Sequence, residues 1–396
     1  MLRECARRAV QNEFKSIIEK EVLELMNLEI FQCSPEGSFE TANMRMPLFG
    51  IEEPLPSDPP TPWNVFMFKF EDVFIFKNLE LLAKDENPDD SAVDQDLISA
   101  YNSLIAYIVE KDTHDICLSK VCKAKDGMVP EMSSKTDIAY ALAVHLFAPL
   151  GGGLCVLDNR SVASPKSCPG GCKRTMQKGP TGIGAMQIWN GFADIFIDQK
   201  IPVKIWKEIP EIITDECEED NDSISDSVSL SGCPTCSSES DFYKHNMDNK
   251  SQLCQLIAQT ITNSFAQVNK NKQLSPYIIP SFGCSNNRMI IFGYDSEGDV
   301  MVKKIDPILL WTCTDNIWHL SVSAVVQIWM YIHFQLLMLP SIAERFETNI
   351  KSNFHRMHTI QCFRKYAKCQ TRFPPEGSVK LLHTHYSIPT KKMKTN

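Results

Sequence analysis

The 396-residue sequence lacks several short motifs that identify common enzyme classes. The glycines at 151–153 belong to neither a Gly-Lys-Ser/Thr nor a Gly-x-Gly-x-x-Gly pattern, which excludes a phosphate-binding loop there. No Gly-x-Ser-x-Gly sequence occurs, so no serine nucleophile of the α/β-hydrolase kind can be nominated. The N-terminal residues lack the apolar core of a secretory signal, and no internal repeat is present.

The composition is that of a folded protein with one large domain or two to three smaller ones. Apolar residues make up 43% of the chain and charged residues 22%, which excludes a disordered chain, a collagen-like repeat and a disulfide-stapled mini-protein. The 15 cysteines are scattered along the chain. Because no secretory signal is seen, we expect reduced thiols and an intracellular protein, cytoplasmic or nuclear.

Charge is distributed unevenly along the chain. Residues 351–396 contain ten Lys and Arg residues and one acid, Glu376, and therefore carry +9. Since the whole chain carries −9, the first 350 residues carry −18. A basic tail attracts polyanions such as nucleic acid or anionic lipid, and it can equally be a solvated segment that keeps the protein soluble.

Composition and periodicity divide the chain into three parts. Residues 1–64 contain an N-terminal amphipathic helix and a Pro-rich linker, and residues 346–396 form the basic tail. Residues 65–345 mix helical and strand-like patterns, and an acidic, Ser-rich stretch at 214–250 predicts a disordered insertion. We expect helices at 97–110, 136–150, 251–269 and 321–339, and strands at 193–198, 201–207, 277–282, 289–294 and 300–305. The sequence therefore predicts an α/β fold with a central mixed β-sheet flanked by helices and a helical N-terminal extension.

Alternating isoleucines predict how two of these strands pair. Ile195 and Ile197 share a face with Ile201, Val203 and Ile205 only if Ile197 pairs with Ile201 and Ile195 with Val203, because a slip of one residue would expose one set. This register also places Asp194 opposite Lys204 on the other face of the hairpin. The simplest interpretation of that pair is a surface ion pair.

The helix expected at 251–269 has an unusual polar stripe. Beside its apolar face run neutral amides and no charges, namely Gln252, Gln255, Gln259, Asn263 and Gln267. Exposed helix faces usually carry Glu and Lys, so this stripe predicts either a partly enclosed polar surface or an ordinary exposed one. Amides both donate and accept hydrogen bonds and suit a metal-bound water or a phosphate.

The order of these elements and residues resembles the PD-(D/E)XK nuclease superfamily, which has the restriction-endonuclease-like fold. The resemblance covers about residues 136–305, with Asp194 at the start of the second strand, Lys204 in the third and Gln255 and Gln259 on the following helix. It implies a nuclease-like topology in which Asp194 helps to bind Mg²⁺ and Lys204 activates the attacking water, with Gln255 and Gln259 nearby. Asp137, on the preceding helix, is a further candidate metal ligand.

The resemblance fails at the second carboxylate of the motif. Pro202 stands two residues before Lys204, where the superfamily has Asp or Glu. A magnesium site usually needs two carboxylates, and a proline supplies no ligand and suits an edge strand. We therefore expect a catalytically degenerate nuclease-like domain that binds nucleic acid, partly through the tail at 351–396, or serves as a scaffold. The alternative on the same residues is an active Mg²⁺-dependent nuclease.

Two cysteine pairs predict a different metal centre. Cys168 and Cys172, in Cys-Pro-Gly-Gly-Cys, and Cys233 and Cys236, in Cys-Pro-Thr-Cys, resemble the two knuckles of a zinc ribbon. The alternative is that these cysteines bind no metal.

The apolar stretch at 321–339 allows two interpretations. It has about the minimum length to span a bilayer, but Gln327, His333 and Gln335 interrupt it. A buried helix on one sheet face explains the same pattern. A membrane-associated or protein-binding adaptor is therefore the third function that the sequence leaves open.

Overall fold

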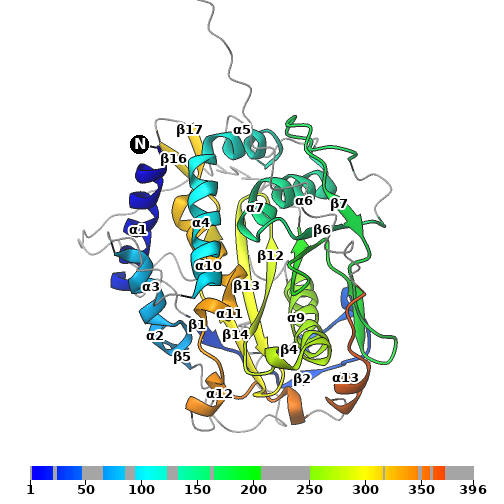
Figure 1. The fold of residues 1–396 in the computed structure, drawn as a ribbon. Coiled ribbons are helices and arrows are strands. Elements are labelled where there is room, and N and C mark those ends of the chain that lie inside the picture. Colours follow the sequence, from blue (N-terminus) through cyan, green and yellow to red (C-terminus); the bar gives the residue numbers. More distant parts are fainter. Residues whose placement is uncertain are drawn as a thin grey trace, which may run out of the picture.

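The computed structural model describes residues 2–20, 25–46, 66–84, 94–122, 133–160, 165–206, 250–314, 317–346, 350–356 and 360–370. In these parts the chain forms one large mixed β-sheet packed against helices (Figure 1). This architecture confirms the expected α/β class with a central mixed sheet. Residues 214–249 of the expected insertion lie outside the described residues.

The large sheet has the strand order β5-β1-β14-β13-β12-β11-β10-β6-β7, and β15 pairs with β13. Its strands are β1 (Leu25–Asn27), β5 (Met67–Phe68), β6 (Cys155–Asp158), β7 (Gln177–Gly179), β10 (Ile195–Ile197), β11 (Ile201–Ile205), β12 (Ile279–Cys284), β13 (Arg288–Asp295), β14 (Val300–Lys304) and β15 (Ile308–Leu309). The described residues also form smaller sheets from β2 (Gln32–Cys33) and β4 (Met44–Arg45), from β3 (Gly37–Ser38), β9 (Trp189–Phe192) and β8 (Gly182–Gly184), and from β16 (Trp311–Thr314) and β17 (Ile317–Leu320).

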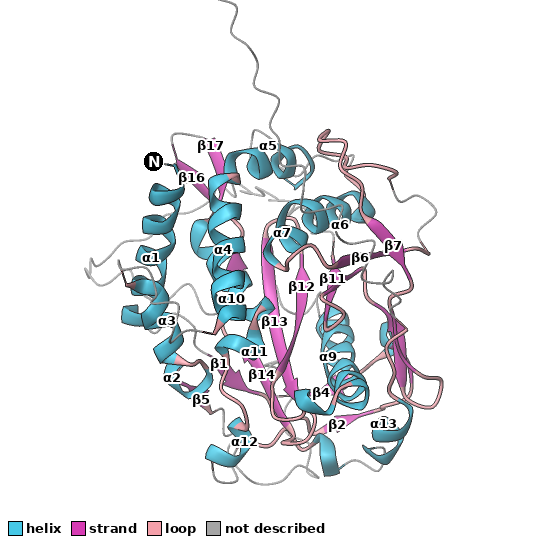
Figure 2. Cartoon of the chain, in the orientation of Figure 1, coloured by secondary structure: helices cyan, strands magenta, loops and turns pink. Residues whose placement is uncertain are grey.

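The helices contribute to two separate hydrophobic clusters. The main helices are α1 (Leu2–Lys20), α3 (Phe76–Ala83), α4 (Gln95–Val109), α5 (Lys111–Cys122), α6 (Lys135–Leu142), α9 (Lys250–Lys270), α10 (Val322–Ile332) and α13 (Ile360–Tyr366), and the short ones are α2 (Phe70–Val73), α7 (Ala148–Leu150), α11 (Phe334–Leu337) and α12 (Ile342–Arg345). One cluster joins α1, α3, α4, α6 and α10 to the sheet, and the other joins α9 and α13 to it. Figure 2 shows α1, α4 and α10 next to one another and α9 apart from them.

The hairpin of β10 and β11 has the register that the isoleucines predict. Ile195 pairs with Val203 and Ile197 with Ile201. The isoleucines of β10 belong to the cluster with α10, and Phe196 between them belongs to the cluster with α9. Because side chains alternate along a strand, β10 contributes to the hydrophobic clusters on both faces of the sheet. A shift of one residue would exchange the two faces, so the register is strongly specified.

The apolar stretch at 321–339 is a buried helix, as one of the two interpretations held. α10 ends at Ile332, the backbone of the following His333 is not helical, and α11 begins at Phe334. Two of the polar side chains that interrupt the stretch have protein partners: Gln327 donates to Ser323 Oγ at 3.2 Å, and His333 Nε2 lies 2.9 Å from Leu150 O. No helix in the described part of the chain combines the length and the apolar character needed to cross a bilayer.

The first and the last described segments of the chain pack on the central domain. α1 contributes Val10 and Phe14 to the same cluster as α10, and β1 pairs with β14 inside the large sheet. At the other end α13 packs against α9 through the fully buried Phe363. The described parts of residues 1–64 and 346–396 are therefore integrated with the α/β domain, although the sequence presents them as an extension and a tail.

Replacing Ile195 with alanine tests this core. We expect the variant to lose about 2–5 kcal/mol of unfolding free energy, because the side chain is fully buried at the hairpin. Urea denaturation gives the measurement. Met186→Ala, at a side chain that is 90% exposed, is the control and should change the value by less than about 0.5 kcal/mol. An equally small change for Ile195→Ala would contradict the register.

Candidate functional site

The elements around Asp194 follow one another in a simple spatial order. β6, β10 and β11 are antiparallel neighbours, and α9 then connects β11 to β12, which pairs with β11 in parallel. A helix is the usual connection between adjacent parallel strands. α6 precedes this unit in the chain. The arrangement places Asp194 just before β10, Lys204 inside β11 and the amide stripe on α9.

Both carboxylate oxygens of Asp194 have protein partners. Oδ2 accepts a hydrogen bond from the backbone N–H of Ile205 at 2.8 Å. Oδ1 lies 3.0 Å from Nζ of Lys135, at the start of α6. The Asp194 side chain is 20% exposed and the Lys135 side chain 42%. The carboxylate therefore holds β11 and α6 to the start of β10, and it does so at a partly open surface.

Lys204 stands beside this ion pair. Its side chain is partly buried, and burial lowers its pKa below the usual value for lysine. The Asp194 carboxylate acts in the opposite direction and raises that pKa. The pairing of Ile195 with Val203 places Asp194 opposite Lys204. Among the described residues, no acid lies within ion-pair distance of Lys204. Lys204 is thus a cation next to an acid whose oxygens are engaged elsewhere.

A second carboxylate, which the sequence analysis did not single out, lies on the neighbouring strand. The N–H of Asp158, the last residue of β6, donates to the carbonyl of Asp194 at 3.0 Å and extends the antiparallel pairing by one residue. The Asp158 carboxylate is bound by Arg160, at 2.7 Å from its terminal nitrogen. That guanidinium also covers the ring of Phe192 at 3.1 Å. The signal in the sequence was a short buried strand ending in Asp, in the segment Leu-Cys-Val-Leu-Asp.

The structure places Pro202 inside the sheet, not on an edge strand as a proline suggests. β11 lies between β10 and β12, but its parallel pairing with β12 begins at Val203, one residue after the proline. The missing N–H therefore precedes the ladder with β12. Pro202 pairs with Phe196 and is buried, and it leaves the position two residues before Lys204 without a carboxylate.

The amide stripe of α9 is partly enclosed, which agrees with one of the two interpretations of it. Gln259, Asn263 and Gln267 are buried. Asn263 donates to Lys200 O at 2.8 Å and Gln267 to Gln199 O at 2.9 Å, so this half of the stripe binds the turn between β10 and β11. These hydrogen bonds hold the turn of the hairpin against α9.

The N-terminal half of the stripe lies beside the part of β11 that contains Lys204. Leu256 and Trp206 both pack against Gly283, which pairs with Lys204. Gln255, the neighbour of Leu256, is partly exposed at this level. One turn further along α9, the side-chain nitrogen of the buried Gln259 has no hydrogen-bond partner among the described residues. Both glutamines therefore lie on the helix segment that covers the site.

Asp137 has a local role in the structure. Its carboxylate accepts hydrogen bonds from the backbone N–H and the hydroxyl of Ser134, at 3.0 and 2.7 Å, and closes a capping box at the start of α6. The residue of α6 that reaches Asp194 is Lys135. The first turn of this helix therefore brings a cation to the position where the nuclease resemblance implies an acid.

A second group of polar side chains gathers around His145. One ligand atom each of Cys117, His145 and Cys172 lie within 4.8 Å of one another, so these residues could hold a metal ion. Cys168 Sγ lies 3.2 Å from His145 Nε2, and Cys172 Sγ lies 3.3 Å from the same nitrogen. The structure thus brings together Cys168 and Cys172, as the sequence predicted. Cys233 and Cys236 lie outside the described residues.

Burial decides the charge of these groups. It lowers the pKa of His145 to about 4, so that the imidazole is neutral near pH 7 and has a lone pair to offer. It raises the pKa of Cys168 to about 12. Sequence reasoning missed Cys117 and His145 because they come from separate helices and share no short spacing motif with the knuckle.

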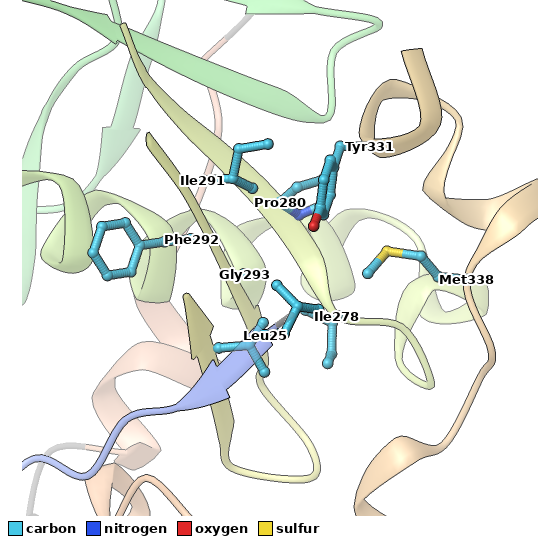
Figure 3. A pocket seen from close by; sticks show the side chains of 9 residues that line it. Leu25, Ile278, Pro280, Ile291, Phe292, Gly293, Tyr331 and Met338 are labelled. Carbon is cyan, nitrogen blue, oxygen red and sulfur yellow. The ribbon is translucent and has the colours of Figure 1, made fainter. Parts of the chain in front are cut away.

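The molecule also contains a small apolar cavity, which Figure 3 shows. Its lining comes from β1, β12, β13, β14, α10 and residues near 278 and 338 and consists of Leu25, Ile278, Pro280, Ile291, Phe292, Gly293, Val302, Tyr331 and Met338. No charged side chain lines it, so it offers no acid, base or metal ligand.

Comparisons of the chain with protein-family models, with curated proteins and with solved structures find no match. The nuclease resemblance consequently rests on the residues and the element order described above.

The contacts of Asp194 predict which of its partners matters for stability. Asp194→Ala leaves the Ile205 N–H and Lys135 without their acceptor and should lower the unfolding free energy by about 1–3 kcal/mol. Lys135→Met removes only a partly exposed ion pair and should cost less than about 1 kcal/mol. Urea denaturation of both variants compares the two. An equal loss in both would show that the backbone hydrogen bond contributes little.

Proposed function

We propose that this chain is a nuclease-like domain whose catalytic site is degenerate and which binds nucleic acid. The observation that carries the proposal is the ion pair between Asp194 and Lys135. Lys204, two residues after Pro202, has no acid within ion-pair distance among the described residues. The order of helix, three antiparallel strands, helix and parallel strand supports the nuclease-like topology that the resemblance implies.

The engaged carboxylates argue against catalysis by a bound Mg²⁺. A hard divalent cation needs several oxygen ligands, commonly including two carboxylates. Asp194 already accepts from Ile205 and Lys135, and Asp158 is paired with Arg160. A metal ion would have to displace both Lys135 and Arg160, and Pro202 has no side-chain oxygen that could coordinate it.

The same cations suit a phosphate group. Lys204 has no acidic partner within ion-pair distance in the described part of the chain. The side chains of Lys135 and Arg160, which pair with Asp194 and Asp158, are 42% and 50% exposed. Lysine and arginine side chains supply most of the affinity for a nucleic-acid backbone. A phosphate that pairs with Lys204 would also be within the field of the other two cations.

The last described part of the basic C-terminal segment lies near the residues that precede Asp194. The N–H of Gln370, the last described residue, donates to Gly182 O at 2.9 Å. The hydroxyl of Thr181, next to Gly182, donates at 2.6 Å to the carbonyl of Ala193, the residue before Asp194. Lys365 and Lys368, shortly before Gln370, are exposed. The last described residues of the basic segment are therefore linked through Gly182 and Thr181 to the residue before Asp194.

Replacing Lys204 with methionine tests binding. Fluorescence anisotropy with labelled single- and double-stranded DNA and RNA, without divalent ions, should detect binding by the native protein. Loss of one phosphate contact should weaken it about tenfold near 0.1 M salt and lower the salt slope by about 1. Lys272→Met removes an exposed charge beyond the far end of α9 and should change the affinity less than about twofold. The proposal would be refuted if the two variants changed the affinity equally, or if the native protein bound none of the four nucleic acids.

An active divalent-metal-dependent nuclease is the second candidate, and Asp158 is the observation that favours it. This residue places a second carboxylate beside Asp194 although Pro202 supplies none.

A cleavage assay on the same four substrates with Mg²⁺ or Mn²⁺ separates the two candidates. We expect no cleavage by the native chain, because both carboxylates are paired with cations. Cleavage that Asp194→Asn, Asp158→Asn and Lys204→Ala each abolish would establish the active nuclease and overturn the degenerate site.

A further inference from the structure

We infer that Cys117, His145, Cys168 and Cys172 form a closed zinc site that braces α5, α6 and the loop before β7. This inference does not depend on the proposed function. The four residues come from three separate segments, and their side chains converge at one point inside the protein. The sequence predicted only the two cysteines of the Cys-Pro-Gly-Gly-Cys segment together with a different second pair.

The distances between the ligand atoms fit a single small ion. In a tetrahedral zinc site, metal bonds of about 2.3 Å to sulfur and 2.0–2.1 Å to nitrogen place neighbouring donor atoms about 3.5–3.8 Å apart. His145 Nε2 lies 3.2 Å from Cys168 Sγ and 3.3 Å from Cys172 Sγ. The ligand atoms of Cys117, His145 and Cys172 all lie within 4.8 Å of one another, whereas Cys168 is outside that group of three and must move toward it to become the fourth ligand. Small outward shifts of the sulfur atoms would open the space for the ion. None of these cysteines is in a disulfide.

The imidazole of His145 is oriented as a metal ligand is. Its Nδ1 lies 3.1 Å from Nδ1 of His114, which leaves Nε2 facing the two sulfur atoms. The ring of His114 is in turn stacked on Tyr107, at 4.6 Å between centroids and 4° between planes. Ligating histidines commonly hold their second nitrogen in such a hydrogen bond, which fixes the ring and the tautomer.

The backbone around the cluster is shaped to bring the ligands together. His145 lies in a π-helical turn, Ala143–Phe147, and such turns are frequent at functional sites because they re-aim a side chain. In the loop, Gly171 N–H donates to Cys168 O at 3.0 Å and closes the turn between the two cysteines. Gly170 packs so tightly on the backbone of Cys117 that a Cβ at this position would overlap it. The glycine thus allows the loop to reach α5.

The donor set favours zinc over magnesium. Thiolate sulfur and imidazole nitrogen are ligands of Zn²⁺, whereas Mg²⁺ requires oxygen. Three thiolates and one neutral imidazole around Zn²⁺ leave a single negative charge. Lys120, whose Nζ donates to Gly170 O at 3.3 Å, lies next to the loop and compensates that charge. Four protein ligands leave no open position, which is the arrangement of a structural site.

Metal analysis of the full chain tests the site. The protein is purified under reducing conditions, loaded with zinc, freed of excess metal and examined by native mass spectrometry. We expect one zinc ion per chain. Cys117→Ser and Cys172→Ser should each lose most of it, whereas Cys313→Ser, at an exposed cysteine outside the cluster, should keep it. Less than about one tenth of a zinc ion per native chain would overturn the inference.

Two further measurements keep the test decisive if a variant folds poorly. Cobalt substitution of the native chain should give the strong visible absorption of a tetrahedral thiolate site, and chelation should lower the melting temperature by about 5 °C or more. A Cys233→Ser/Cys236→Ser double variant should retain its zinc. Loss of zinc in that double variant, with retention in Cys117→Ser, would instead assign the metal to the zinc-ribbon pairing that the sequence predicted.

Discussion

The register between β10 and β11 is the constraint on which the rest of the domain depends. It directs Ile195 and Ile197 into the cluster with α10 and Phe196 into the cluster with α9, so that one short hairpin anchors helices in two separate cores. A slip of one residue would exchange all of these side chains at once. The buried amides of α9 hold the turn of the same hairpin, which gives the helix and the strands a common alignment.

That alignment brings acidic and basic groups together at one end of the hairpin. Asp194 and Asp158 lie on neighbouring strands, but each is already satisfied by a cation, Lys135 or Arg160. A carboxylate paired with a fixed cation stabilises the fold and has little affinity left for a metal ion. Among the described residues, Lys204 has no acid within ion-pair distance, and the phosphate binding that we propose depends on this lysine.

The helix α6 links this surface to the cysteine cluster. Its first turn supplies Lys135 to Asp194, and the π-helical turn that follows its last residue supplies His145 to the sulfur atoms. A metal ion bound by the cluster would fix the end of α6 against α5 and the loop before β7. The position of Lys135 at the other end of the same short helix then depends on that anchor.

Local periodicity in the sequence predicted the strands at 193–198 and 201–207, their register and the helix of α9. It left open whether the amides of α9 are enclosed and whether the stretch at 321–339 is a buried helix or a membrane span. The predicted features follow from patterns that repeat every two or 3.6 residues, and burial of one face enforces them. The partners of Asp194 and of the Cys168–Cys172 knuckle could not be predicted in this way. Lys135 is separated from Asp194, and Cys117 from Cys168, by more than fifty residues, and no spacing rule joins such positions. Their contacts exist because the folded sheet and the packing of α5 and α6 bring distant segments to the same place.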